Sequence, residues 1–237
     1  MIATVFHTLI YDPLYNGLIF FVGVIPTHDV GLAVIALTIV VRFVLFPLSR
    51  RAVDAQLKMK KIAPQIEAVK EKYKSNKEEQ GKAIFALYKE NDVHPFASMG
   101  LLLVQLPILL ALYWVFANGG LPTIDSTLLY SFVQAPAAVN MHFLGFLDMS
   151  GHNIVLGVLA ALTQFAYTRL SMGPREKPVS GQSFSGDLAK SFDLQARYVL
   201  PATFLFLSFV IPNAAMVYLV TSNSFMVAQE LFAGRRF

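Results

Sequence analysis

Long apolar runs limit what this chain can fold into more than any other feature. They cover Val30–Leu48, Phe96–Ala117, Asn153–Thr168 and Tyr198–Gln229, and the only charge within them is that of Arg42. A helix that crosses the hydrocarbon core of a bilayer needs about 20 apolar residues. Only 14% of the 237 residues are charged, against roughly 25% in a soluble domain. The sequence therefore predicts an all-α integral membrane protein and argues against an ordinary soluble enzyme.

The last run is too long for one crossing. Tyr198–Gln229 has 32 residues, which would make a single helix about 48 Å long. Pro212 lies near its middle and is followed by Asn, and this pair favours a turn. Arginines flank both ends of the run, and both ends are therefore expected on the cytoplasmic side. We predict two short helices, at 198–211 and 213–232.

The positions of the basic residues predict the topology. Of the 19 Lys and Arg residues, 11 fall in 49–95 and five in 169–197, whereas 1–29 and 118–152 contain none. By the positive-inside rule, five transmembrane helices follow, with the N-terminus outside and the C-terminus inside. The predicted order is an outer interfacial helix in 1–29, transmembrane helices at 30–48, 96–117, 153–170, 198–211 and 213–232, a cytoplasmic helical hairpin at 49–95, an outer loop at 118–152, a cytoplasmic loop at 171–197 and a cytoplasmic tail at 233–237.

The segments 1–29 and 49–95 need separate arguments. Leu14–Ile25 is a mostly apolar stretch of only twelve residues between two prolines, which is too short to span, so an interfacial position is predicted. In 49–95, apolar residues recur at helical spacing from Ile62 to Tyr73 and again from Ile84 to Tyr88. Two antiparallel helices are predicted there, with a break or a helix start at Pro64.

Arg42 is the residue that most indicates a function. It lies 12 residues from one end of its predicted helix and six from the other. An Arg at such a depth costs from about 3 to over 10 kcal/mol and normally faces a bundle interior or water. Thr38 lies one turn away on the same face. The pattern predicts a hydrated polar surface inside the bundle, and the alternative is that Arg42 snorkels to the cytoplasmic headgroups.

Polar residues on the other predicted helices could complete such a surface. Gln105, Gln164, Tyr218 and Ser222 are the candidates. The alternative reading is that each only joins two helices by a hydrogen bond, which is worth about 0.6 kcal/mol on average.

The sequence shows no pattern that is typical of a metal site, a nucleotide site or a hydrolase site. There is no cysteine, the five histidines have no metal-ligand spacing, and no nucleotide-binding or hydrolase motif is visible. No Asp or Glu falls within a predicted span before Glu230, which argues against a cation pump. We therefore expect no catalytic residue, no metal and no cofactor.

Several motifs follow one another along residues 38–223. They are TIVVRFVLFPLSRRA, QLKMKKIAPQIEAVKEKY, LYKENDVHPF, LLLVQLPILLALYWVF, LTQFAYTRLSM and FLSFVIPNAAMVYLVTSN. Their order resembles that of the YidC/Oxa/Alb membrane protein insertases. This resemblance implies a five-helix core around a hydrophilic groove that opens to the cytoplasm and the lipid, with Arg42 as its positive charge. It also implies that Thr38, Gln105, Gln164 and Tyr218 line the groove, and we add Ser222. The chain departs from the family at Ala214-Ala215 and Leu219, where a Gly-Leu and a Trp are usual.

The resemblance predicts an insertase and chaperone in the bacterial inner membrane. Its expected substrates are nascent membrane proteins with short polar or acidic outer segments. The Sec translocon, the ribosome and anionic lipids are further candidate partners, and DNA is not. Two alternatives stay open: a small anion transporter or channel that uses Arg42, and an assembly chaperone that holds partner helices without moving them.

Overall fold

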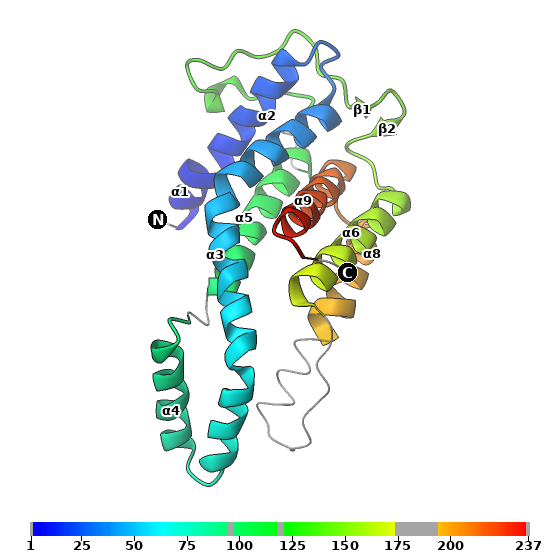
Figure 1. The fold of residues 1–237 in the computed structure, drawn as a ribbon. Coiled ribbons are helices and arrows are strands. Elements are labelled where there is room, and N and C mark those ends of the chain that lie inside the picture. Colours follow the sequence, from blue (N-terminus) through cyan, green and yellow to red (C-terminus); the bar gives the residue numbers. More distant parts are fainter. Residues whose placement is uncertain (1, 94–96, 118–120, 174–193, 236–237) are drawn as a thin grey trace. The chain divides into compact units, whose positions relative to one another are not determined.

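The structure is a computed structural model that describes residues 2–93, 97–117, 121–173 and 194–235 (Figure 1). These residues form two compact units. One comprises Met1–Phe43 with Pro107–Phe237 and is called the bundle unit here; the other, Val44–Leu106, is called the paired-helix unit. Most of the cytoplasmic loop predicted at 171–197 lies outside the described residues.

The chain begins with a longer helical segment than the sequence predicts. Helix α1 (Ile2–Phe6), the π-helical turn η1 (His7–Tyr11) and α2 (Asp12–Val24) follow one another without a break. Pro13 does not end the segment: it follows directly on the π-helical turn η1, which is where the backbone accommodates the missing N–H. The buried face repeats at helical spacing and packs into the bundle unit; it consists of Leu14, Tyr15, Leu18, Ile19 and Val22.

Helix α3 (Val30–Lys72) contributes residues to both units and contains Pro47 and Pro64. The predicted break at Pro64 was therefore wrong. A proline removes one backbone hydrogen bond and crowds the preceding turn. Here Ile62 and Ile66, on either side of it, are buried in one hydrophobic cluster, and this packing keeps the turn helical.

The paired-helix unit contains the end of α3, a turn, and α4 (Lys77–Glu90), which lies beside α3 in Figure 1. The Asn76 side chain caps α4 by accepting hydrogen bonds from the backbone N–H groups of its first turn. The buried cluster between the helices comprises Ile62, Ile66 and Val93, with Ile84, Leu87 and Tyr88 packed against it. Burial in this contact raises the pKa of the Tyr88 hydroxyl.

The bundle unit is completed by later helices of the chain. These are α5 (Ala97–Ala117, of which the unit holds residues from 107 onward), α6 (Ile154–Met172), η3 (Gln195–Val199), α8 (Leu200–Leu207) and α9 (Asn213–Phe232). Helix α6 packs against both α8 and α9 (Figure 1). A Cβ atom on Gly157 would collide with the Ser208 side chain, so glycine permits the close approach there. The chain turns at Pro212, between α8 and α9.

The segment at 121–152 is irregular but contains a small β-hairpin that the all-α prediction did not include. Strands β1 (His142–Phe143) and β2 (Leu147–Asp148) pair antiparallel, and a 3₁₀ turn, η2 (Ser126–Leu128), precedes them.

Three described helical segments are long and apolar enough to cross a membrane: Thr4–Val24, Val30–Ala52 and Ile154–Met172. The shorter segment Gln105–Phe116 is also apolar. The protein is therefore a mostly helical membrane protein. The first segment covers residues that the sequence placed in the interface. The full set of five spans and their orientation stays a prediction.

Candidate functional site

Arg42 is enclosed within the bundle unit. Its exposed fraction is 3%, and its Nε donates a hydrogen bond of 2.7 Å to Oγ of Ser222 on α9. Its Nη2 contacts the same oxygen. Burial of a charge is costly unless the charge has partners. The contact therefore joins α3 to α9 by a polar interaction inside the bundle unit.

The helical repeat of α3 explains this position. Val34, Thr38 and Arg42 are four residues apart, and all three are buried, whereas Val40 and Phe43 are exposed. Thr38 donates its hydroxyl to the Val34 carbonyl oxygen at 2.6 Å. One face of the helix thus meets the bundle and another is apolar and exposed. The structure turns Arg42 inward, so it does not take the snorkelling conformation of the alternative reading.

Buried polar groups of α6 and α9 extend the site. Gln164 donates from Nε2 to the Thr168 hydroxyl at 3.2 Å, within α6. Tyr218 is buried on α9, one turn from Ser222, and Tyr218 and Tyr167 lie within electrostatic range of the Arg42 guanidinium. We call Arg42, Ser222, Tyr218 and Tyr167 the Arg42 cluster.

An ion pair lies near the ends of α6 and α9 and was not predicted. Glu230 is 2% exposed, and its Oε2 lies 3.0 Å from Nη1 of Arg235. The same nitrogen donates to the Ser171 carbonyl oxygen at 2.8 Å. Tyr167 on α6 lies near Glu230, Arg235 and Arg42. It therefore links the ion pair to the Arg42 cluster. A lone carboxylate in an otherwise uncharged helix, with an arginine five residues later, was the signal available in the sequence.

Three buried polar residues at the other end of the bundle were also missed. Asp29 accepts hydrogen bonds from the backbone N–H groups at the start of α3, and Asn16 and Asn213 bond the backbone of the 121–152 segment. Asp29 directly precedes an apolar run, which is a typical helix N-cap position.

Comparison with known proteins identifies the family. Residues 21–237 match the family described as 60Kd inner membrane protein. The chain belongs to this family. It is 30% identical over 206 residues to the membrane protein insertase YidC of Clostridium tetani, an alignment that covers 87% of this chain and 82% of that protein. It is 28% identical over 207 residues to the membrane protein insertase YidC of Francisella tularensis subsp. novicida, of which it spans 33%. The resemblance stated from the motifs is thereby confirmed, and the relatives are named as insertases rather than enzymes.

Within this family member, the predicted site residues fall into two groups. Arg42 and Ser222 are in direct contact, Tyr218 lies close to Arg42, and Thr38 lies one turn along α3. Gln164 bonds within α6, and Gln105 belongs to the paired-helix unit, so the cluster is built from bundle-unit residues alone.

The chemistry that the cluster offers is anion recognition. A guanidinium beside hydroxyl groups favours carboxylates, because hydrogen bonds between ionised groups are roughly twice as strong as those between neutral ones. Within the described residues, no group of three or more His, Asp and Glu side chains could hold a metal ion.

Proposed function

We propose that this chain inserts nascent membrane proteins into the bacterial inner membrane and assists their folding, as a multi-pass protein of five spans with its N-terminus outside. Membership in a family whose members are named insertases supports the activity. The distribution of Lys and Arg along the sequence supports the orientation.

The observation that carries the proposal is the contact between Arg42 and Ser222. Ser222 offers Arg42 a neutral hydroxyl oxygen. A carboxylate on the outer segment of a nascent chain would bind the guanidinium more strongly than this hydroxyl does. The incoming segment therefore replaces Ser222 at Arg42, and α3 and α9 separate to form the polar side of a groove that is open to the cytoplasm and to lipid. Thr38, Gln164 and Tyr218 line the same groove, and Gln105, which belongs to the paired-helix unit, is assigned to it by the motif resemblance alone.

The driving force comes from the substrate rather than from nucleotide hydrolysis. A polar segment that enters hydrocarbon alone leaves its hydrogen-bonding groups without partners. Groups on α3, α6 and α9 supply partners during the crossing. The apolar segment of the substrate then moves into lipid along the exposed apolar faces of the helices, and its burial yields about 25 cal/mol per Å².

The paired-helix unit is proposed as a cytoplasmic hairpin that meets substrates and partners. Residues 49–95 carry 11 basic and seven acidic residues, a moderate positive excess. Such a surface is suited to binding anionic lipid headgroups and ribosomal RNA. The same unit is also a candidate contact for the Sec translocon.

The proposal is tested by insertion into proteoliposomes of purified protein. Arg42→Ala should slow insertion of a substrate with an acidic outer segment by about 10- to 100-fold, which corresponds to the loss of one or two hydrogen bonds to a charged group. Arg42→Lys should largely retain activity because it keeps the charge. Arg169→Ala, which removes an exposed arginine in the last turn of α6, is the matched control.

Equal insertion by wild type, Arg42→Ala and Arg42→Lys would remove Arg42 from the mechanism. The same proteoliposomes also test the transporter alternative, which the charge of Arg42 favours. Anion flux without a nascent chain, abolished by Arg42→Ala, would support a transporter instead.

A further inference from the structure

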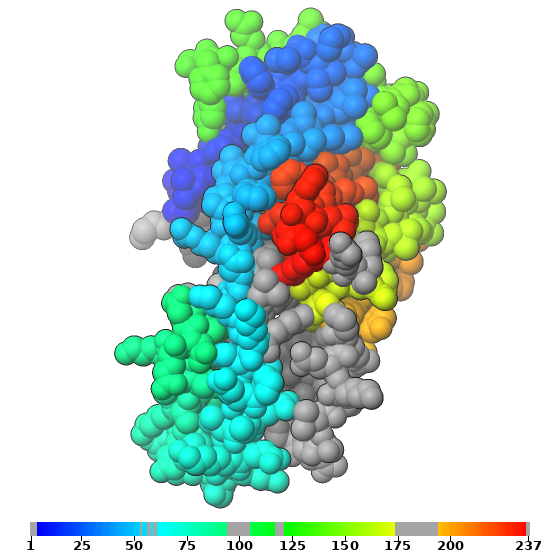
Figure 2. Space-filling model, viewed as in Figure 1, coloured from blue at the N-terminus to red at the C-terminus, as the bar shows by residue number. Residues whose placement is uncertain are grey.

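The β1–β2 hairpin exposes two large apolar side chains at its tip. Leu144 is 59% exposed and Phe146 is 75% exposed. Figure 2 shows this green segment at the right-hand edge of the bundle unit. Tight turns in water are dominated by Gly, Pro, Asn, Asp and Ser. The large apolar side chains of Leu144 and Phe146 in a single turn therefore indicate that the tip faces something other than water.

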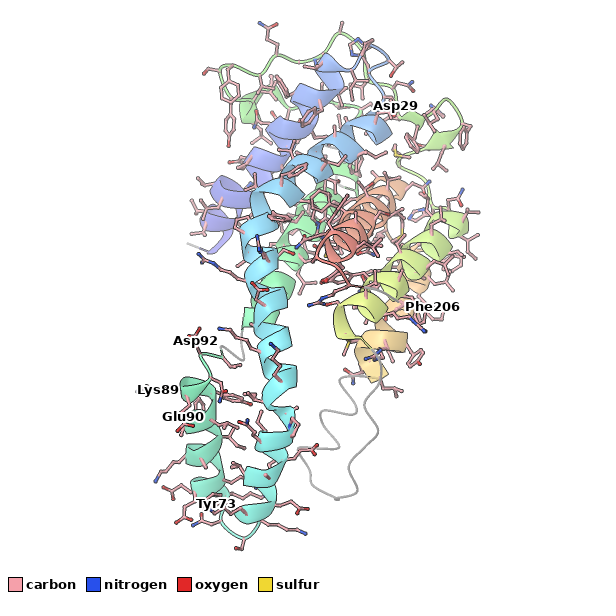
Figure 3. All side chains as sticks on the ribbon, in the orientation of Figure 1. Asp29, Tyr73, Lys89, Glu90, Asp92 and Phe206 are labelled. Atoms are coloured by element: carbon pink, nitrogen blue, oxygen red, sulfur yellow. The ribbon has the colours of Figure 1, made fainter. Side chains whose placement is uncertain are left out.

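The backbone of the tip is held in an uncommon conformation. Leu144 has φ of 51° and the following Gly145 has φ of 85°. Bulky residues rarely adopt positive φ. The Leu144 N–H donates a hydrogen bond of 2.8 Å to Oδ2 of Asp29, the buried residue labelled in Figure 3 at the start of α3. The fold therefore fixes the turn that presents both apolar side chains.

The rest of the hairpin is fixed to the start of two helices. Asn213, the first residue of α9, donates from Nδ2 to the Asp148 carbonyl oxygen at 2.7 Å. Phe143 packs on Gly31 in the first turn of α3, where any Cβ atom would collide with the ring. The hairpin is thus positioned by α3 and α9, and its tip cannot turn inward without the loss of these contacts.

Large exposed apolar side chains also lie at the start of α6, which follows the hairpin in the chain, and just after α8. Ile154 and Val155 in the first turn of α6 are exposed, as are Phe209 and Val210 just after α8. Helix α6 is one of the segments long and apolar enough to cross a membrane. Exposed apolar side chains on such a helix are expected to face lipid, so lipid is the expected occupant of the surface next to the tip. Residues 118–152 also contain no Lys or Arg.

We propose that Leu144 and Phe146 insert into a lipid bilayer, at the boundary between headgroups and acyl chains, in the leaflet where α6 and α9 begin. Aromatic and large aliphatic side chains favour this boundary and bury roughly 5–10 Å into it. The hairpin acts as a fixed stop that sets how deeply the starts of α3, α6 and α9 lie in the membrane. This role is separate from insertase activity.

The absence of cysteine from the chain allows a direct test. Leu144→Cys and Phe146→Cys would each be labelled with an NBD fluorophore, with Ser150→Cys, an exposed polar position just after β2, as the control. The full-length proteins are placed in nanodiscs whose phospholipids are brominated near the top of the acyl chain. Quenching by bromine should be several-fold stronger at 144 and 146 than at 150, and quenching by aqueous iodide should follow the opposite order.

Two results would overturn the proposal. Iodide quenching at 144 and 146 as strong as at 150 would place the tip in water. Protection of both positions from both quenchers would place a protein surface over the tip, either a second copy of this chain or another partner. Because the two labelled positions are independent, a local defect caused by one substitution does not decide the result.

Discussion

Arg42 and Ser222 are 180 positions apart in the chain and yet form a hydrogen bond of 2.7 Å in the interior of the bundle unit. The bond crosses between α3 and α9, next to an edge-to-face contact of Phe43 with Phe225 on the same two helices. The Ser222 hydroxyl that accepts this bond is neutral. An anionic group would bind the Arg42 guanidinium more strongly and could therefore replace Ser222 there.

Substitutions at Ser222 test this replacement. Ser222→Asp places a carboxylate beside Arg42, which should compete with acidic substrates and lower their apparent affinity by about 10- to 100-fold. Ser222→Asn introduces a side chain of nearly the same size as Asp but without the charge, and this variant should retain most of the activity. Both are measured by insertion of a substrate with an acidic outer segment, with a neutral-tailed substrate as the reference. Equal effects of the two substitutions on both substrates would contradict a role for charge.

The close approach of α6 and α8 makes a prediction about stability. Gly157→Ala forces the Ser208 side chain to move, at a cost of about 1–3 kcal/mol. Gly81→Ala, within α4, has open space around the new Cβ atom and should stabilise its helix by about 0.5–1 kcal/mol. Thermal unfolding in detergent compares the two, and the melting temperatures should shift in opposite directions. A melting temperature of Gly157→Ala that is unchanged or higher than that of the wild type would show that the space around Gly157 is not limiting.

The Glu230–Arg235 ion pair should show strong energetic coupling. Arg235→Ala leaves a buried carboxylate without this partner and should destabilise the protein by about 3–5 kcal/mol. The double variant Glu230→Gln with Arg235→Ala should be more stable than Arg235→Ala alone, because it removes the buried charge. A double-mutant cycle from denaturant unfolding gives the coupling. Additive effects of the two single changes would mean that the ion pair contributes nothing beyond its separate side chains.

The local stability of the paired-helix unit should depend on the buried side chains of its hydrophobic cluster and not on exposed ones. Ile66→Ala should cost about 2–4 kcal/mol of local stability, because it opens a cavity between α3 and α4. Phe85→Ala removes a larger but exposed side chain of α4 and should change this local stability little. Hydrogen exchange of the α4 amides reports this local stability. Faster exchange in Phe85→Ala than in Ile66→Ala would contradict the packing.

Features that depend on local chemistry could be predicted from the sequence. The cost of a charge in an apolar helix identified Arg42, and the structure brings Ser222 into contact with it. The Pro212 turn follows from the backbone constraint of proline. Pro64 was misread because the same constraint was overcome by tertiary packing of Ile62 and Ile66, which no local rule includes.

Long-range polar contacts could not be predicted. Asp29 has the local signature of an N-cap, but its bond to Leu144 joins residues 115 positions apart. The partner of Glu230 was near in sequence, yet its burial depends on how α6 and α9 pack together. The first helical segment was underestimated because Pro13 was expected to mark a boundary, whereas the π-helical turn η1 carries the helical segment up to this proline.

The most direct test of the central claim is a disulfide crosslink between the protein and an arrested insertion intermediate. Ser222→Cys places the chain's one thiol beside Arg42, and Ser224→Cys places it at an exposed position on the same helix. The substrate carries a single cysteine next to an acidic residue of its outer segment. The account predicts a crosslink at 222 that is several-fold stronger than at 224 and that is lost when Arg42 is replaced by Ala. A crosslink at 224 as strong as at 222, or one at 222 that persists without Arg42, would contradict it.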